Sequence, residues 1–287
     1  MSALQICTLY KSMNENTIYY IWLSMLSGIG NVLAHRLLKK FINPEYIYKA
    51  TYVDLLETND IGVAKAAAII ANKDLSAAND ILKKCTSQNI DIIHIDSENF
   101  PLKLKSNNEM PILIYGKGGY YNPKKTVGIV GPRKCSRTDR ENAIKLADSL
   151  SKDNCCIVSG MAIGIDAYAH TAALKKDKPT IAVLGNGVDI CYPSDHLDLY
   201  RAIINNGSVI SEYPPGARAT RYSFPERNKI IAGLSDELYV IGSGKKSGSL
   251  ITASFAEKYE RKVYYINCAS DSVSCSAPFS LPADSSP

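Results

Sequence analysis

Between residues 126 and 266 the sequence alternates short, almost wholly apolar runs with longer segments of helical periodicity. Apolar runs of this kind are typical of strands buried on both faces, and their alternation with helices indicates a parallel sheet covered by helices. The predicted strands are 126–130, 156–158, 180–184, 208–211, 237–241 and 262–266, and the predicted helices are 141–150, 167–174, 195–204 and 250–259. The pattern predicts an α/β fold: a doubly wound, Rossmann-like domain with a mainly parallel sheet.

Residues 1–88 show helical periodicity only, with short polar breaks, and predict a small all-helical domain. The expected helices are 18–26, 32–41, 45–48, 53–57, 63–70 and 75–84. Between the first two, Gly28-Ile29-Gly30 resembles a helix-hairpin-helix turn, and a weaker copy surrounds Gly62. Such a turn can present backbone amides to a phosphate, and it can equally serve only to pack helices or dock a partner.

Two further segments complete the predicted domain organisation. Residues 89–125 contain expected strands at 92–95 and 112–115 and form a connecting extension of the α/β domain, which itself covers 126–267. Residues 268–287 are rich in Ser and Pro and predict a disordered tail, which suggests an aberrant, truncated or frameshifted end. Met13 is a possible native start.

Composition excludes several classes of protein. With 46% hydrophobic and 21% charged residues, the 287-residue chain is neither disordered nor fibrous. It shows no apolar run long enough to span a bilayer and no signal peptide pattern, so we expect a cytoplasmic protein. Its eight cysteines form no C-x-x-C pair, which favours reduced structural thiols over a metal site. The net charge of +5 suits a polyanionic partner such as nucleic acid.

Basic and glycine-rich segments border the expected carboxyl ends of the strands, where ligands bind in doubly wound folds. They are residues 128–137, 159–166, 185–189, 224–229 and 242–252, and their cations include Arg133, Arg227, Lys229, Lys245 and Lys246. Glycines let backbone amides approach an anion, and helix N-termini favour negative charge. Each loop alone could be ordinary turn chemistry. Their gathering on one edge predicts a phosphate-binding cleft.

Catalytic signatures are missing from the same loops. The segment after the first strand lacks the dinucleotide-binding glycine pattern, and Gly244-Lys245-Lys246-Ser247 lacks P-loop spacing. No serine stands in a recognisable nucleophile motif, and His170 is expected to be structural. Asp166 could act as a general base, but at a helix start we expect it to cap backbone amides. The sequence therefore predicts binding without catalysis, cofactor or metal.

Six collinear motifs resemble those of the DNA-processing protein A (DprA/Smf) family. They are Gly131-Pro132-Arg133, the run from Ser159 to Asp166, the run from Ala182 to Asp189 with Tyr192-Pro193, the run from Ser211 to Gly216, the run from Phe224 to Ser235, and the run from Lys246 to Ala253. The resemblance covers residues 126–267, and the helical region before it resembles the sterile-alpha-motif-like (SAM-like) domain that often precedes this core.

The resemblance implies a non-catalytic protein that binds single-stranded DNA, protects incoming strands and loads RecA recombinase during natural transformation and recombination. It also implies a homodimer formed through the Rossmann-like domain. The DNA-binding residues that it implies are Gly131, Arg133, Ser159, Gly160, Met161, Ala162, Gly164, Asp166, Arg227, Asn228, Lys229, Lys246, Ser247, Gly248 and Ser249. Arg133 would hold a backbone phosphate, and the 159–164 loop would offer amides and a hydroxyl to the next one. Phe224, Tyr213 and Tyr222 are the nearest candidates for base stacking.

The chain departs from the family pattern at three places. Ile163 replaces an arginine of the Ala-Arg-Gly-Ile-Asp motif, Gly242-Ser243 replaces a Glu-Ala pair, and the sequence after Ile266 lacks the Val-Pro-Gly turn. An alternative function is that of a nucleotide-processing enzyme of the lysine decarboxylase-like phosphoribohydrolase type, whose Pro-Gly-Gly-x-Gly-Thr motif is absent here. A third is a sensor or scaffold that binds a mononucleotide, or RecA alone.

Overall fold

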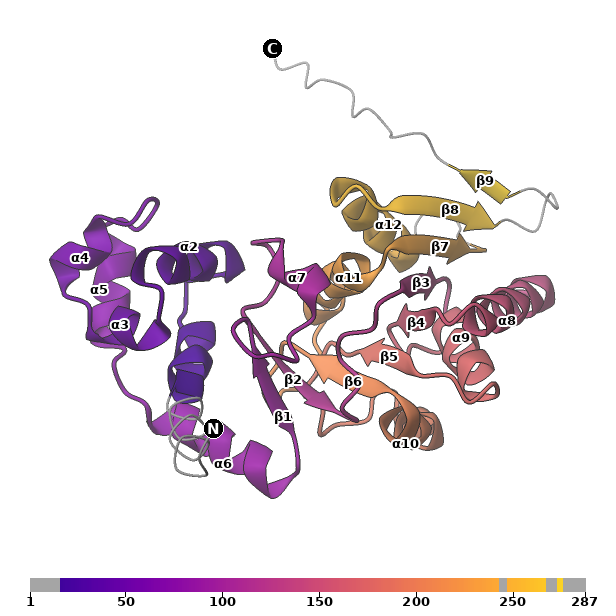
Figure 1. Cartoon of the computed structure of the whole chain (residues 1–287), viewed down its shortest axis with the longest axis horizontal. Coiled ribbons are helices and arrows are strands. Elements are labelled where there is room, and N and C mark those ends of the chain that lie inside the picture. The colour runs from indigo at the N-terminus through magenta and orange to yellow at the C-terminus, as the bar shows by residue number, and fades with distance from the viewer. Residues whose placement is uncertain (1–15, 243–246, 267–272, 276–287) are drawn as a thin grey trace, which may run out of the picture. The chain divides into compact units, whose positions relative to one another are not determined.

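The computed structural model describes residues 16–242, 247–266 and 273–275 of the chain, and its internal contacts divide it into two compact units (Figure 1). Unit 1 comprises Met1–Asn122, Gly185–Ile190 and Ile210–Ala219, and unit 2 comprises Pro123–Leu184, Cys191–Val209 and Thr220–Pro287. The predicted domain boundaries at 88, 125 and 267 stay predictions. Each unit is described by itself.

Unit 1 begins with helices, as the sequence predicts. Residues 16–25 are helical, followed by α2 (Asn31–Phe41), α3 (Pro44–Lys49), α4 (Tyr52–Leu56), α5 (Val63–Ala71) and α6 (Ser76–Ser87). The starts carry clear signals: Asn43 caps α3 with Pro44 at its first position, and Thr51 forms a capping box with Asp54. Strand β1 (Asp91–His94) pairs antiparallel with β2 (Leu113–Lys117), and the short helix α7 (Leu102–Lys105) lies between them in sequence.

The two predicted hairpin turns have the same backbone geometry. Gly28 and Asp60 have φ of +79° and +64°, and each is followed by a buried isoleucine, Ile29 or Ile61. The isoleucine amide bonds back across the turn, to Leu26 O at 3.1 Å or to Thr58 O at 3.0 Å. Unit 1 thus contains two helix-hairpin-helix-like turns of the same geometry, and in each an isoleucine side chain packs in the core.

The sheet of unit 2 is mainly parallel. Its strands are β3 (Thr126–Val130), β4 (Cys156–Ser159), β5 (Thr180–Val183), β6 (Ser208–Ser211), β7 (Glu237–Ile241), β8 (Lys262–Ile266) and β9 (Val273–Cys275), in the order β6-β5-β4-β3-β7-β8-β9. The pairs β3–β4, β4–β5, β3–β7 and β7–β8 are parallel, whereas β9 runs antiparallel to β8. Strand β9 lies within residues 268–287, the segment predicted to be a disordered tail. The remaining residues of that segment lie outside the described ones.

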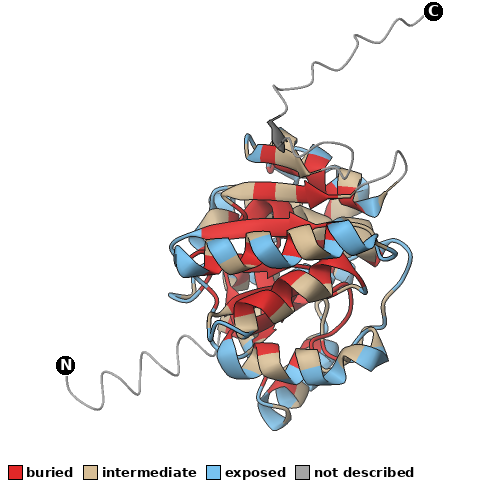
Figure 2. Ribbon diagram, turned by 90° about the vertical axis from the view of Figure 1, so that its right-hand side faces the viewer, coloured by how far each residue is buried: buried red, intermediate tan, exposed pale blue. Residues whose placement is uncertain are grey.

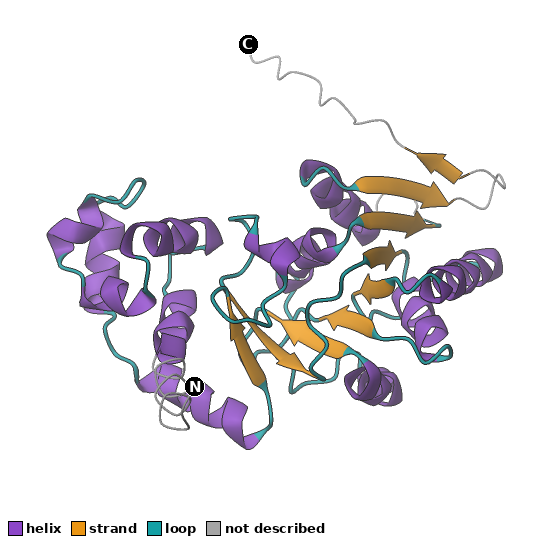
Figure 3. Ribbon diagram, viewed as in Figure 1, coloured by secondary structure: helices purple, strands orange, loops and turns teal. Residues whose placement is uncertain are grey.

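The helices of unit 2 follow their strands in turn (Figure 3). They are α8 (Arg137–Lys152), α9 (Ile165–Leu174), the single 3-10 turn η1 (Ser194–His196), α10 (Leu197–Asn206), α11 (Ser223–Leu234) and α12 (Gly248–Lys258). This alternation confirms the Rossmann-like class. Among the described residues, no helix has the length and apolar character needed to cross a bilayer.

The prediction for residues 224–229 is wrong. The sequence placed them in a loop, and the structure places them in helix α11. The amide of Ser223 bonds to Thr220 Oγ1 at 3.1 Å, and the helix starts at this residue. Pro225 falls in the first turn, where a missing N–H costs no intrahelical bond. Pro225, which the sequence suggests would interrupt a helix, is therefore compatible with the start of α11.

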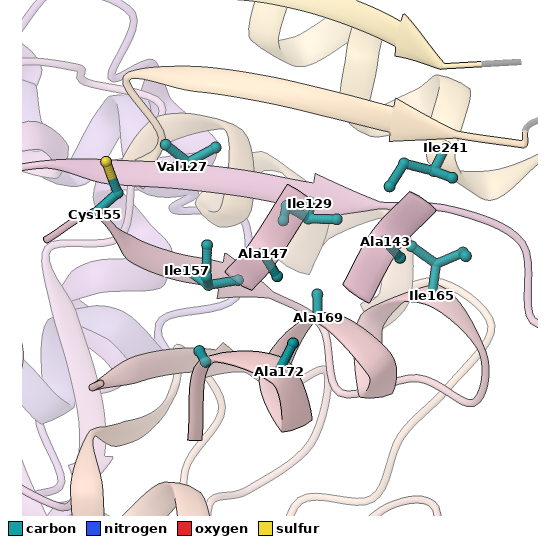
Figure 4. Packing of buried hydrophobic residues seen from close by; sticks show 11 residues of the cluster. Val127, Ile129, Ala143, Ala147, Cys155, Ile157, Ile165, Ala169, Ala172 and Ile241 are labelled. Carbon is teal, nitrogen blue, oxygen red and sulfur yellow. The ribbon is translucent and has the colours of Figure 1, made fainter. Parts of the chain in front are cut away.

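Small residues on two helices allow them to lie close to the strands. Ala143 and Ala147 of α8 and Ala169, Ala172 and Ala173 of α9 join Val127, Ile129, Ile157 and Ile241 in one buried cluster (Figure 4). Figure 2 shows buried strands beside helices that have one buried and one exposed side. The core therefore holds the strand ends, and the loops that leave them, in fixed positions.

Candidate functional site

A pocket of about 280 Å³ lies where the strand order of unit 2 reverses. The chain runs from β3 through β4 and β5 to β6, and then returns to β7 on the other side of β3. Ligands of open α/β sheets bind at such a switch point, outside the carboxyl ends of the strands. The pocket is lined by Val130, Gly131, Pro132, Arg133, Ala162, Asp166, Phe224, Arg227, Asn228, Ile231, Ser247, Gly248, Ser249 and Thr252.

The loops after β3 and β4 touch through glycines. Gly164 has φ +93°, and a Cβ there would lie 2.4 Å from Pro132 O. A Cβ on Gly131 would lie 2.7 Å from Ile241 O. Since no side chain fits at either position, both glycines are required by close backbone approach.

Asp166 shapes the β4–α9 loop from below. Its Oδ2 accepts hydrogen bonds from the amides of Gly160 at 3.2 Å and Ala162 at 3.3 Å. The carboxylate thus bonds backbone amides as expected, but these amides belong to the loop before α9, whose own N-cap, Gly164, has no side-chain cap. Burial raises the pKa of the carboxyl group, and the neighbouring charge of Arg227 opposes that shift. Asp166 therefore holds the loop in shape.

Ser159, the last residue of β4, and Met161 of the loop each have a polar atom bonded within the protein. The Ser159 hydroxyl is buried and donates to Ile129 O at 2.6 Å, so its proton has a partner inside the protein and its DNA-binding role stays a prediction. Met161 is fully buried with φ +57°, and its carbonyl oxygen lies 3.0 Å from His196 Nδ1. The pocket wall from this loop is backbone and small side chain.

Arg227 is a brace, although the sequence suggested a phosphate ligand. Only 6% of its surface is exposed, and its Nη1 donates to Gly160 O at 2.6 Å and to Val183 O. A Cβ on Gly160 would lie 2.4 Å from the same nitrogen, which explains the glycine. The guanidinium thus ties together the ends of β4 and β5 beneath the pocket.

Helix α11 presents one face to the pocket. Phe224, Arg227, Asn228 and Ile231 follow the i, i+3, i+4, i+7 spacing of a single helix face, and all four line it. Asn228 Nδ2 also donates to Gly248 O at 3.4 Å, which links α11 to α12.

Lys229 lies off this face and does not line the pocket. Its Nζ lies 2.5 Å from Glu226 Oε2 and 5.5 Å from the Phe255 ring centre. Its predicted place in the groove therefore has no support in the pocket geometry.

The first turn of α12 forms another wall. The Ser247 hydroxyl accepts from the Ser249 amide at 3.3 Å and lies 2.6 Å from the Ser249 hydroxyl. Gly248 has open space around it, with no atom within 4 Å of an added Cβ. Lys245 and Lys246, which the sequence also placed here, lie outside the described residues.

Arg133 and Phe224 line the pocket together, and the ring of Tyr192, which is not part of the lining, lies beside Phe224. Arg133 is exposed, with its guanidinium carbon 5.4 Å from the Phe224 ring centre. The Tyr192 ring, 45% exposed, lies 5.7 Å from Phe224. Sequence reasoning missed Tyr192 as a stacking candidate, although the residue stands in one of the motifs. Tyr222 stacks with Arg221 and does not line the pocket, and Tyr213 belongs to unit 1.

The sequence placed the loop after β5, residues 185–189, in the cleft, but this loop does not line the pocket. Within unit 1, Asp189 pairs with Lys84 Nζ at 2.9 Å and accepts from the Gly216 amide at 2.8 Å. The carboxylate and its loop are thus engaged in other contacts, and none of residues 185–189 lines the pocket.

Two departures from the family pattern have visible consequences. Ile163, in the arginine position, is 49% exposed. Gly242 has φ +60°, and an added Cβ would lie 2.4 Å from the Asp139 carboxyl group, which caps the start of α8. Ser243 lies outside the described residues.

His170 is structural, as predicted. It is fully buried, with Nδ1 2.7 Å from Thr180 Oγ1, and burial lowers the pKa of the imidazole to about 3. Within the described residues no three His, Cys, Asp or Glu side chains gather as metal ligands would.

Comparisons with known proteins agree on one family. The family model described as DNA recombination-mediator protein A matches residues 91–281. Protein Smf of Synechocystis sp. is 34% identical over 256 residues, covering 88% of this chain and 64% of that protein. DNA processing protein DprA of Streptococcus pneumoniae is 39% identical over 168 residues, covering 58% of this chain and 59% of its own length. The chain thus spans less than two thirds of these curated relatives.

Solved structures give the same relationship. The X-ray structure of S. pneumoniae DprA has a TM-score of 0.71 and 31% identity, and the match covers 86% of each chain. DNA processing protein A from Helicobacter pylori, described with a single-stranded DNA binding mode, has a TM-score of 0.55 and 29% identity, covering 61% of this chain and 80% of that one.

Proposed function

This chain belongs to the DNA recombination-mediator protein A (DprA/Smf) family, and we propose that it binds single-stranded DNA without catalysis. The observation that carries the proposal is the pocket at the switch point, where exposed Arg133 stands beside Phe224 and the first turn of α12. A cation and a helix N-terminus suit a phosphate, and an aromatic ring suits a base. The H. pylori relative, which has a single-stranded DNA binding mode, supports the same ligand.

In this proposal the pocket residues divide into ligand contacts and supports. Arg133 holds a backbone phosphate, and the backbone amides of Gly248 and Ser249 contribute at the start of α12. Phe224 and Tyr192 stack on bases, which favours an unpaired strand because duplex bases are already stacked. Arg227 and Asp166 act indirectly, since they hold the loops that carry these groups.

Further roles rest on the family relationship. We infer protection of incoming DNA, RecA loading in transformation and recombination, action in the cytoplasm, and a homodimer through the Rossmann-like domain. Two measurements test the assembly claims. Analytical ultracentrifugation should give a dimer, and the protein should accelerate RecA nucleation on a strand coated with single-strand-binding protein. A monomer at working concentration, or an unchanged nucleation rate, would contradict the respective claim.

The DNA-binding claim is tested by fluorescence anisotropy with a labelled single-stranded oligonucleotide and its duplex. We expect tighter binding to the single strand, with affinity that rises with strand length and falls with salt. Equal affinity for both forms would contradict a stacking site.

An enzyme of the phosphoribohydrolase type is tested separately. Incubation with nucleoside monophosphates should release neither free base nor phosphate. Turnover that disappears in an Asp166→Asn variant would support the enzyme instead.

A further inference from the structure

Unit 2 holds a second pocket, of about 460 Å³, between α8, α9 and η1. Tyr168 forms part of its wall, with the guanidinium carbon of Arg140 5.7 Å from the ring centre. Ile144, which is 39% exposed, and Leu199 add apolar surface. A flat apolar ligand can therefore lie against this wall.

The two pockets meet at the β4–α9 loop and the first turn of α9. Ala162 and Asp166 line the first pocket, whereas Ala167 and Tyr168, the next residues along the chain, line the second. His196 lines the second pocket and contacts the carbonyl of Met161 in the same loop at 3.0 Å. The loop that forms one wall of the first pocket therefore also contacts a lining residue of the second.

The charges around the second pocket favour an anion. Arg140 and Lys175 line it and are exposed, and neither has a carboxylate within ion-pair distance among the described residues. Glu141 also lines the pocket, but its carboxylate is paired with Arg137 Nε at 2.9 Å, and Arg137 is not part of the lining. Asp195 is the remaining acidic residue of the lining. With Glu141 neutralised by Arg137, the two cations Arg140 and Lys175 face one further carboxylate, that of Asp195.

We propose that this second pocket is an adjoining nucleotide subsite of the same single strand, an inference that rests on the proposed function. A base stacks on Tyr168, and Arg140 and Lys175 hold the flanking phosphates. Ile163, 49% exposed in the intervening loop, offers apolar contact where the strand crosses. The first pocket alone serves a short strand, and both serve a longer one.

The test compares a trinucleotide with an oligonucleotide long enough to span both pockets, using the full chain. Because Tyr168 packs against the core cluster, we choose Tyr168→Leu to keep volume while removing the ring, and Arg140→Gln at an exposed site. Each should weaken binding of the long strand by about fivefold or more and leave trinucleotide binding unchanged. Tyr168→Phe should bind as the wild type does. Lys152→Gln, at the opposite end of α8, is the matched charge control.

The outcomes separate the two proposals. If the wild type binds a single strand and both variants bind the long strand with wild-type affinity, the second subsite is refuted and the first pocket stands. If the wild type binds neither strand, the proposed function and the subsite both fail. A direct readout is photo-crosslinking with 5-iodouracil strands, which should attach to Tyr168 in the long complex. Crosslinks confined to the first pocket would contradict the subsite.

Discussion

At the scale of the residue, the two arginines of the first pocket have different tasks. Arg227 is buried and bonded to two backbone carbonyls, whereas Arg133 is exposed. We expect Arg227→Ala to lower the free energy of unfolding by about 3 kcal/mol, because two buried acceptors lose their donor. Arg133→Ala should leave stability unchanged. Urea denaturation of both variants checks this, and equal stability of the two would contradict the bracing role.

His170 gives a prediction for pH. Burial lowers the pKa of its imidazole from 6.5 to about 3, so between these values the unfolded chain binds a proton that the folded protein excludes. Stability should therefore fall as pH drops through that window, with a contribution from this group of up to about 1.4 kcal/mol per pH unit. Imidazole NMR shifts give the direct measurement. Titration of His170 near pH 6.5 in the folded protein would refute the assignment.

At the scale of the element, the contact between the β3 and β4 loops depends on Gly164. An added Cβ would clash with Pro132 O at positive φ, so Gly164→Ala should destabilise unit 2 by about 2 kcal/mol and weaken strand binding. Gly248→Ala is the matched control for stability alone, because its Cβ meets open space in the first turn of α12, a turn that the proposal places in contact with the strand. Thermal unfolding and anisotropy measure both effects. Wild-type behaviour of Gly164→Ala would mean that the loops do not touch as described.

The hairpin turns of unit 1 offer a second matched pair. Gly28 has φ +79°, and Gly30, the cap of α2, has φ −76° with open space around it. Gly28→Ala should cost about 1 kcal/mol of stability, since an L side chain is strained at positive φ, and Gly30→Ala should cost little. Hydrogen exchange at the buried Ile29 amide reports the local effect. Equal protection in the two variants would contradict the turn geometry.

At the scale of the whole molecule, regular features were readable from sequence and spatial ones were not. The bounds of β3, β7 and β8 match their predictions, because each strand contains a run of β-branched, apolar or aromatic residues between polar segments. Helix α11 was not predicted, because a proline such as Pro225 is typical of a loop. The helical spacing of α11 shows that Lys229 does not lie on the helix face that Phe224 and Asn228 share.

The site shows the same limit. The glycines and Asp166 were found because close approach and capping leave local signatures. The brace formed by Arg227 depends on Val183, and the position of Tyr192 beside the pocket depends on Phe224, both distant in sequence. Sequence motifs indicate which residues lie near the site, but the burial of each side chain decides which of them can contact a ligand.

The salt dependence of single-strand binding tests the central claim most directly. For wild type and Arg133→Ala, log K is measured against log salt concentration, with Lys152→Ala as the control for loss of a surface charge. We predict that Arg133→Ala weakens binding at low salt and reduces the magnitude of the slope by about 0.7, as expected for one lost phosphate contact. The control should match the wild type. An Arg133→Ala protein with wild-type affinity and slope would show that this pocket does not hold the strand.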